Sequence, residues 1–263
     1  MHIRALMENT TLQPELLIEH GLSLYIEVGE HKILFDMGQS DAFITNAVRL
    51  GVDLRQVDIA ILSHGHYDHG GGLHAFLELN EHAVVYINEN AFIPHFSGTE
   101  KAIGINPNLR NHERVIITQN HFVIDQGISL HTGNAFCRSY VTNSVNLFQV
   151  IDGRKEIDLF LHEQYLLLEE KGQRILISGC SHKGILNIMK WFSPDILIGG
   201  FHYKHLGIIG EDQLRLQYEA LQLMQYRTKY FTCHCTGISQ YKYLKSIMGE
   251  QLQYLATGDR IQI

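Results

Sequence analysis

Cysteine is scarce in this sequence, with four residues among 263, and three of them lie within two residues of a histidine. A disulfide framework is therefore unexpected, and a reducing cytoplasmic environment is the expected setting. No apolar run approaches the roughly 20 residues that a membrane-spanning helix needs. Residues 1–9 also lack the apolar core of a signal peptide, so we expect neither secretion nor a membrane partner.

An excess of positive charge is missing as well. The 21 Lys and Arg residues are outnumbered by 28 Asp and Glu residues, giving a net charge of −7. This balance argues against a nucleic-acid backbone as the main partner. The hydrophobic content of 45% is ample for a large core, and we expect one α/β domain over residues 1–263. The sequence does not indicate an oligomeric state.

The sequence does contain a histidine-rich loop at residues 63–72. An apolar run typical of a buried strand precedes it at residues 57–62, and a helical repeat of apolar residues follows it. Alternate side chains at a strand end share a face, so residues from one loop can serve two neighbouring ions. Imidazole and carboxylate are ligands for zinc and similar metals, and metal pairs about 3.5–4 Å apart are a recurring hydrolytic device. The candidate ligands are His64, His66, Asp68 and His69.

Alternating or continuous apolar runs predict many short strands along the chain. Helical periodicity predicts a helix at residues 40–50 with Ser40 as N-cap, and another through Ile185, Ile188, Met189 and Phe192. The strands are expected near residues 2–8, 21–28, 32–38, 57–62, 83–87, 115–118, 122–130, 162–169, 195–202 and 253–256, and at the starts of the strand-to-turn segments 174–184 and 229–237.

A third helix is predicted at residues 211–225, with Leu214, Tyr218 and Leu221 facing the core. Between the predicted strands, residues 88–112 show no periodicity and hold two of the four prolines. A long irregular segment in a compact domain is usually functional or mobile. We interpret residues 88–112 as a lid or substrate-facing loop, with surface decoration as the open alternative.

The order His64-x-His66-x-Asp68-His69, followed by two glycines, resembles the signature loop of the metallo-β-lactamase fold superfamily. The motifs Ser-Gly-Cys-Ser-His-Lys-Gly-Ile, Gly-Gly-Phe-His and His-Cys-Thr-Gly are similar to the subgroup named after dihydropterin–ribofuranosylaminobenzene phosphate synthase. The resemblance implies a four-layer αββα fold, in which two mixed β-sheets are sandwiched between helices.

The resemblance also implies two divalent metal ions, with zinc expected and manganese, iron or magnesium as alternatives. It places Asp36, at the end of a strand, in hydrogen-bonded support of a histidine ligand. For the first ion it favours His162 as the third ligand, with His182 as the competitor. Archaeal members of the subgroup tend to carry an acid near position 162, so their metal preference does not carry over to this chain. The implied ligands are His64, His66 and His162 for one ion, Asp68, His69 and His234 for the other, and Cys180 between or beside them.

Several candidates have a plainer interpretation. Cys180 could be a small buried hydrophobe, but its place before His182 favours a ligand. Cys233 and Cys235 are expected to pack in the core on either side of His234. His202 could be a buried structural histidine, although its place after two glycines favours a pocket.

The expected substrate is small and anionic. His182 and Lys183 precede a helix, where N–H groups attract anions, and His202 and Lys204 are expected to extend this anion-binding wall. Asp68 is expected to orient the attacking water, which makes Asp68, His182 and His202 the candidate catalytic residues.

We therefore predict a dinuclear metal-dependent hydrolase, acting on a phosphoester. The alternative is a metal-dependent transferase or synthase like the namesake of the subgroup. Iron redox chemistry ranks lower, because Cys180 is atypical there and no flavodoxin module accompanies the domain. A metal-binding protein without catalysis is disfavoured by the complete ligand set.

Overall fold

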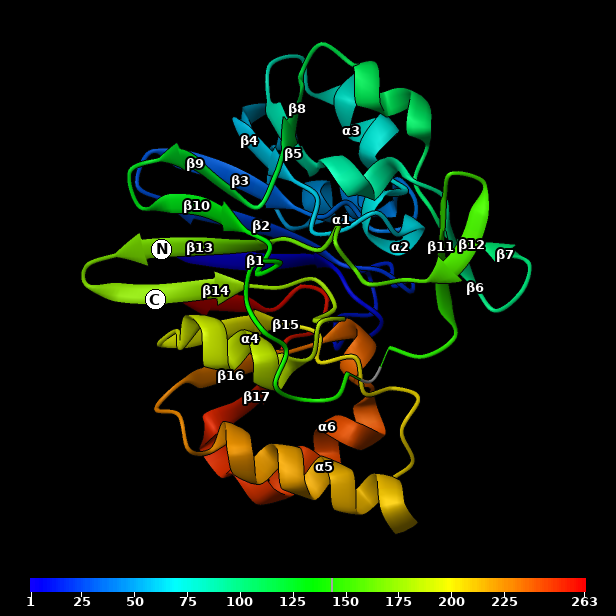
Figure 1. The fold of residues 1–263 in the computed structure, drawn as a ribbon. Helices are drawn as coiled ribbons and strands as arrows, with labels where there is room; N and C mark the ends of the chain where they lie inside the picture. Colours follow the sequence, from blue (N-terminus) through cyan, green and yellow to red (C-terminus); the bar gives the residue numbers. More distant parts are fainter. Residues whose placement is uncertain (143) are drawn as a thin grey trace. The chain divides into compact units, whose positions relative to one another are not determined.

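The computed structural model describes residues 1–142 and 144–263, and contacts divide the chain into two compact units (Figure 1). Unit 1 comprises Met1–His121, Val145–Gln164 and Ala256–Ile263, and unit 2 comprises Phe122–Ser144 and Tyr165–Leu255. Each unit has its own seven-stranded sheet and its own apolar core.

The main sheet of unit 1 is mixed, with strand order β18-β1-β2-β3-β4-β5-β8. Neighbours from β18 to β3 pair antiparallel, and those from β3 to β8 pair parallel. The strands are β1 His2–Met7, β2 Ser23–Val28, β3 His31–Phe35, β4 Ile59–Ile61, β5 Val84–Asn88, β8 Val115–Thr118 and β18 Arg260–Gln262. The parallel half directs the carboxyl ends of β3 and β4 to the same edge, where Asp36 and the histidine-rich loop follow.

Helices α1 (Ala42–Arg49) and α3 (Leu73–Leu79) pack apolar side chains into the core of unit 1. Phe43 and Phe76 are fully buried, and burial of such a side chain contributes about 1.5–3 kcal/mol. Helix α1 begins one residue later than predicted, with Asp41 at the N-cap. Ser40 still accepts a hydrogen bond, from the backbone N–H of Ala42 at 3.2 Å.

Unit 1 also contains a four-stranded sheet, β12-β11-β6-β7, that the sequence analysis did not predict. Its strands are short, and two are partly buried while the other two are exposed, so they carry little hydrophobic alternation. They are β6 His95–Ser97, β7 Lys101–Ala102, β11 Leu147–Ile151 and β12 Arg154–Ile157.

The segment 88–112, interpreted from sequence as a lid or decoration, supplies β6 and β7 and two 3₁₀ helices, η2 (Glu89–Phe92) and η3 (Pro107–Asn111). It is bonded to the histidine-rich loop, because Tyr67 N–H donates to the carbonyl of Ile103 at 2.8 Å. Gly65 approaches Ala91 so closely that a side chain at Gly65 would overlap the carbonyl of Ala91. The segment therefore forms a fixed wall beside the loop.

The sheet of unit 2 is also mixed, with strand order β17-β16-β15-β14-β13-β10-β9, and several of these strands are labelled in Figure 1. The predicted strand at residues 122–130 is in fact two strands separated by a turn at Gln126 and Gly127. The strands are β9 His121–Asp125, β10 Ile128–His131, β13 Tyr165–Glu170, β14 Gln173–Ile177, β15 Ile196–Gly199, β16 Lys229–Thr232 and β17 Leu252–Tyr254.

Helices α4 (Ile185–Phe192), α5 (Gly210–Leu223) and α6 (Ile238–Met248) contribute to the apolar core of unit 2. Three short 3₁₀ helices complete the elements: η1 (Leu54–Gln56) in unit 1, and η4 (His234–Thr236) and η5 (Gly249–Gln251) in unit 2. The predicted apolar face of α4 is confirmed, because Ile185, Ile188, Met189 and Phe192 are all buried. Among the described residues, no helix is both long enough and apolar enough to cross a membrane.

The predicted inward face of α5 is wrong. Leu214, Tyr218 and Leu221 are 67%, 51% and 48% exposed, whereas the buried side chains are Leu216, Glu219, Ala220 and Leu223. The two apolar stripes have the same i, i+4, i+7 spacing, so periodicity alone does not choose between them. The buried face instead carries an acidic residue, Glu219.

Candidate metal centre

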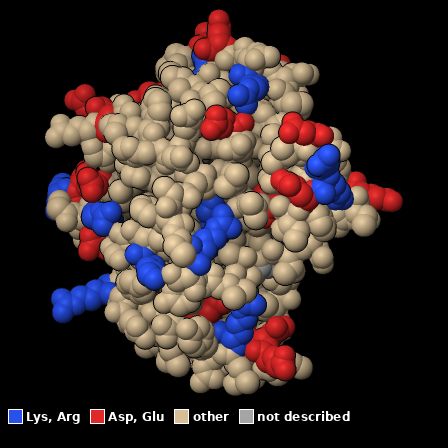
Figure 2. Space-filling model, in the orientation of Figure 1, with Lys and Arg blue, Asp and Glu red and all other residues tan. Residues whose placement is uncertain are grey.

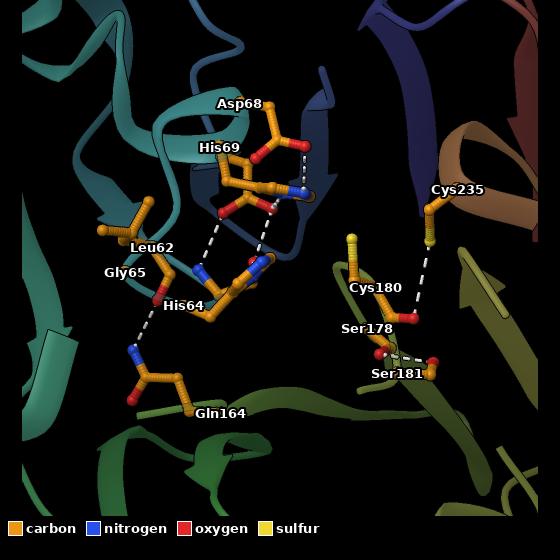
Figure 3. A network of polar contacts seen from close by, with 12 residues as sticks. Leu62, His64, Gly65, Asp68, His69, Gln164, Ser178, Cys180, Ser181 and Cys235 are labelled. Atoms are coloured by element: carbon orange, nitrogen blue, oxygen red, sulfur yellow. Dashed lines mark hydrogen bonds and ion pairs between the residues drawn. The ribbon is translucent and has the colours of Figure 1, made fainter. Parts of the chain in front are cut away.

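The histidine-rich loop leaves β4 and turns into the short helix α2 (Tyr67–Gly70), and its four candidate ligands are all buried. The His64 ring lies 4.5 Å from that of His66 and 4.2 Å from that of His69, centroid to centroid. Figure 3 shows Asp68 beside His69, with His64 close by. The loop thus brings three imidazoles and a carboxylate together, as the sequence predicted.

Asp36 follows β3 and is buried beneath this loop. Its Oδ2 lies 2.6 Å from Nδ1 of His69, and it accepts hydrogen bonds from Ser63 N–H at 2.7 Å and from the Ser63 hydroxyl at 2.8 Å. The same hydroxyl lies 2.8 Å from Nδ1 of His64. A carboxylate accepts the Nδ1 proton of His69, so the lone pair of that ring is on Nε2. Asp36 therefore fixes a ring orientation suited to metal binding.

Asp68 has a partner that the sequence analysis missed. Nε2 of His20 lies 3.3 Å from Oδ2 of Asp68, and Nδ1 of His20 lies 3.2 Å from the amide nitrogen of Asn9. Oδ2 of Asp68 is also 3.8 Å from Nε2 of His69. Nothing in the local sequence around His20 marks it, because the contact joins the segment before β2 to α2.

A second cluster in unit 1 contains residues from three separate segments. One donor atom from each of His66, His95, Asp158 and His162 lies within 4.8 Å of the others. Oδ2 of Asp158 is 2.8 Å from Nδ1 of His95 and 3.2 Å from Nε2 of His162. From sequence, His95 belongs only to the irregular segment 88–112, and Asp158 was not among the predicted ligands. The i, i+4 spacing of Asp158 and His162 was the available signal.

His162 was predicted to open a strand, but it precedes β13 by three residues. Its position is fixed by its neighbours: Nδ1 accepts a hydrogen bond from the N–H of Gly65 at 2.8 Å, and Gln164 is bonded to the carbonyls of Ser63 and Leu62, each at 2.8 Å. The Gln164–Leu62 bond is visible in Figure 3. This anchoring places His162 beside the histidine-rich loop without a strand.

The charges in this cluster favour metal ligands. Burial alone would raise the pKa of Asp158, but electrostatic interactions and hydrogen bonds with His162 and His95 hold that pKa well below its ordinary value. Burial, reinforced by His162, lowers the pKa of His66 well below its ordinary value. The carboxylate is therefore ionised and the His66 imidazole neutral, which are the forms that bind metals.

Unit 2 holds its own sets of candidate ligands around Cys180, which lies beyond the end of β14 and is buried. Donor atoms of Cys180, His182 and His202 lie within 4.8 Å of one another, and so do those of Cys180, His234 and Cys235. The thiol of Cys235 donates to the carbonyl of Cys180 at 3.5 Å, as Figure 3 shows. The predicted ligands Cys180 and His234 thus lie together.

Cys235 was expected to be a core residue, and it is buried like Cys233. Burial alone would raise the pKa of its thiol, but hydrogen bonds with Cys180 and His202 and the charge of His234 bring that pKa well below its ordinary value. A thiolate is a strong ligand for zinc and similar metals. The structure therefore adds Cys235 to the candidate ligands.

The predicted anion-binding wall is only partly formed as expected. His182 lies 3.0 Å, through Nδ1, from the hydroxyl of Ser144, and its ring centroid is 4.3 Å from that of His202. Lys204 is exposed. Lys183 differs from the expectation: its side chain is fully buried, and its ammonium donates to the carbonyl of Thr132 at 2.6 Å. Lys183 is therefore an internal cation of unit 2.

Two buried ring nitrogens indicate that the candidate ligand sets of both units fit a metal ion. Nε2 of His95 and Nδ1 of His202 are buried and make no hydrogen bond within residues 1–142 and 144–263. A buried nitrogen without a partner is costly, whereas imidazole, thiolate and carboxylate donors together suit zinc and its borderline neighbours. The residues of both units fit bound divalent metal; their division between two particular ions remains a prediction.

Comparison with known proteins supports this chemistry. Residues 18–141 match the metallo-beta-lactamase superfamily. An uncharacterized protein of Methanocaldococcus jannaschii is 30% identical over 76% of this chain and 78% of its own length. The 7,8-dihydropterin-6-methyl-4-(beta-D-ribofuranosyl)-aminobenzene-5'-phosphate synthase of the same organism is 26% identical over 93% of this chain and 90% of its own.

Among solved structures, a metal-dependent hydrolase of the beta-lactamase superfamily superimposes with a TM-score of 0.82 and 27% identity. The match covers 100% of this chain and 99% of that one. The chain belongs to the metallo-β-lactamase superfamily and has its mixed α/β fold. Within that superfamily it is similar to the dihydropterin–ribofuranosylaminobenzene phosphate synthase, as its motifs suggested.

Proposed function

We propose that this protein is a metal-dependent hydrolase of a small anionic substrate, most simply a phosphoester. The observation that carries the proposal is the buried group formed by Asp36, His64, Asp68 and His69, in which a carboxylate already orients an imidazole for metal binding. The similarity to a metal-dependent hydrolase over nearly the full length of both chains supports the same reaction class.

A divalent ion in such a site supplies a Lewis acid and lowers the pKa of water to about 7. The side chains supply position. Asp36 holds the His69 ring, and Asp68, one of whose oxygens faces His20 and His69, is a hydrogen-bond acceptor suited to orienting the attacking water. In unit 2, His182, His202 and the exposed Lys204 are suited to contact an anionic group of the substrate.

We propose zinc as the metal, with two ions per chain and with manganese, iron or magnesium as alternatives. Nitrogen and sulfur donors predominate in the unit 2 sets, which favours zinc over magnesium.

We also propose that the protein is cytoplasmic. Its cysteines are few, and all four are free thiols, one exposed and three buried, as expected in a reducing compartment. Figure 2 shows the Lys and Arg side chains scattered among Asp and Glu on the face drawn, which supports a small substrate over a nucleic acid.

The test is a panel of phosphomonoesters and phosphodiesters, offered to protein stripped of metal and then reconstituted separately with zinc, manganese, iron or magnesium. We expect hydrolysis of at least one class only in a reconstituted sample. Asp68→Asn serves as the matched control, because it removes one charge at the site while keeping the shape of the side chain. Hydrolysis by the metal-free protein contradicts the proposal. So do equal hydrolysis rates in reconstituted wild type and reconstituted Asp68→Asn.

A second candidate is a metal-dependent transferase or synthase. It is favoured by the 26% identity to the dihydropterin–ribofuranosylaminobenzene phosphate synthase over most of both chains. This candidate predicts coupling of a pterin pyrophosphate to an aminobenzene acceptor with release of pyrophosphate. Hydrolysis of phosphoesters without such coupling favours the hydrolase, and coupling without hydrolysis favours the synthase.

A further inference from the structure

His95 is a buried histidine with one ring nitrogen unused. It begins β6, its exposure is 1%, and its Nε2 makes no hydrogen bond within the part of the chain that the structure describes. The backbone here is held by two hydrogen bonds, since Val150 N–H donates to the carbonyl of Pro94 at 3.0 Å and Ile103 N–H donates to the carbonyl of His95 at 2.8 Å. The ring is therefore held in place, while its Nε2 has no hydrogen-bond partner among the described residues.

The other ring nitrogen defines the tautomer. Nδ1 of His95 lies 2.8 Å from Oδ2 of Asp158, and the position of that carboxylate is fixed by the N–H of Phe160, which donates to Oδ1 at 2.6 Å. A carboxylate accepts hydrogen bonds, so the proton of His95 is on Nδ1 and the lone pair is on Nε2. A histidine that donates one N–H to a carboxylate and presents the other nitrogen bare has the arrangement typical of metal-ligating histidines.

His162, predicted from sequence as the third ligand of the first ion, is in the opposite state. Its Nδ1 accepts the N–H of Gly65 at 2.8 Å, so the proton is on Nε2, which faces Asp158 at 3.2 Å. Both of its nitrogens are engaged in hydrogen bonds. The rings of His95 and His162 lie 4.0 Å apart, centroid to centroid, with a tilt of 34°, and both residues belong to the cluster that contains His66.

We propose that His95 is a metal ligand of unit 1 through Nε2, that Asp158 fixes its tautomer, and that His162 is a positioning residue. The site takes a divalent ion of the zinc type together with His66, because a donor atom of each residue in this cluster lies within 4.8 Å of the others. The inference rests on the metal dependence in the proposed function, and it changes which side chains hold the metal.

The test compares His95→Phe, His162→Phe and Asp158→Asn with wild type in cobalt(II) and zinc affinity, measured by competition with a chelator, and in the visible absorption spectrum of the cobalt(II) protein. Phenylalanine keeps a planar ring and removes the nitrogens. His74→Phe is the matched control, because His74 is an exposed histidine of α3 paired only with Glu78, at 3.4 Å, among the described contacts.

We expect His95→Phe to lower the affinity for one ion by more than 100-fold and to change the cobalt(II) spectrum. Asp158→Asn should lower affinity about 10–100-fold, as loss of a carboxylate behind a ligating histidine does. His162→Phe should lower it less than His95→Phe and leave the spectrum close to wild type, and His74→Phe should change neither. If His95→Phe does not fold, His95→Gln replaces it with the same expectation.

Unchanged affinity and spectrum in the His95 variants overturn the inference, and so does a loss of metal that is larger in His162→Phe. These outcomes differ from failure of the proposed function. A wild-type protein that binds metal but hydrolyses no phosphoester contradicts the hydrolase and leaves His95 as a ligand. A hydrolase whose His95 variants keep their metal contradicts only the inference.

Discussion

Oδ2 of Asp36 lies 2.6 Å from Nδ1 of His69, and both side chains are completely buried. Asp36, which directly follows β3, adopts a positive φ of 60°, a conformation that is uncommon outside glycine. Strain of this kind persists where the surroundings fix it, and here the carboxylate also accepts two hydrogen bonds from Ser63. The pair links the central strand of unit 1 to the histidine-rich loop.

The first prediction concerns this pair. Asp36→Asn keeps the shape of the side chain but removes the charge that orients His69, so metal affinity should fall about 10–100-fold. Chelator competition measures the affinity, and circular dichroism checks that the fold is kept. Asp58→Asn is the control. Oδ2 of Asp58 lies 2.6 Å from Nδ1 of His31 in the same unit, so the variant changes a similar Asp–His pair in which neither residue is a candidate ligand. Equal affinities for the Asp36 variant and wild type contradict the role assigned to Asp36.

The second prediction separates chemistry from metal binding. Asp68→Asn should reduce turnover by a larger factor than it reduces bound metal, because we assign Asp68 both to the metal and to the attacking water. Metal content by elemental analysis and the turnover number are measured on the same samples. A variant that is fully loaded and turns over at the wild-type rate would show that Asp68 orients nothing.

The third prediction tests the contact between the loop and segment 88–112. Gly65→Ala should destabilise the protein by about 1–3 kcal/mol or more, because the added Cβ overlaps the carbonyl of Ala91. Gly104→Ala, in the same segment, is the control: its Cβ would lie 3.4 Å from the backbone nitrogen of His95, an ordinary contact. Thermal or urea unfolding measures both, and equal stabilities would mean that the wall moves away from the loop.

The fourth prediction concerns the acidic residue on the buried face of α5. The hydroxyl of Tyr203 donates to Glu219, which is also 3.2 Å from Nε of Arg215, and burial together with Glu219 raises the pKa of Tyr203 well above its ordinary value. Tyr203→Phe should cost about 1.5–3 kcal/mol, since a hydrogen bond to a buried charged group is lost.

Tyr230→Phe is its matched comparison. The Tyr230 hydroxyl donates to the neutral carbonyl of Leu223 at 2.9 Å, so its loss should cost only about 0.5–1.5 kcal/mol. Urea unfolding of the two variants gives the order directly. A smaller cost for Tyr203→Phe than for Tyr230→Phe would show that Arg215 alone satisfies Glu219.

The features that depend on residues close together in the chain could be predicted from the sequence. The strand–loop–helix around His64 and the apolar face of α4 depend on neighbouring residues, and the structure has them. The strand predicted at residues 32–38 is also present, but it covers His31–Phe35. The family resemblance supplied the fold, which the comparisons confirm.

The missed features depend on contacts between distant segments. His95 and Asp158 are 63 residues apart in the chain. They meet where β11 pairs with β6 on one side and with β12, the strand just before Asp158, on the other, and these short strands show no pattern in the sequence. The inward face of α5 was misassigned because the buried Glu219 is satisfied by Tyr203 and Arg215, which the helical period does not reveal. Lys183 was expected to meet an anion, yet a carbonyl from a different segment binds its ammonium.

The central claim is that hydrolysis depends on metal held by these side chains. It is tested most directly by titrating metal-free protein with zinc, measuring bound zinc and the hydrolysis of a phosphoester substrate in the same samples. The account predicts no hydrolysis without metal and a rate that rises with bound zinc until about two ions are held per chain. Hydrolysis that persists in the chelator-treated protein, or that saturates while no zinc is bound, would contradict it.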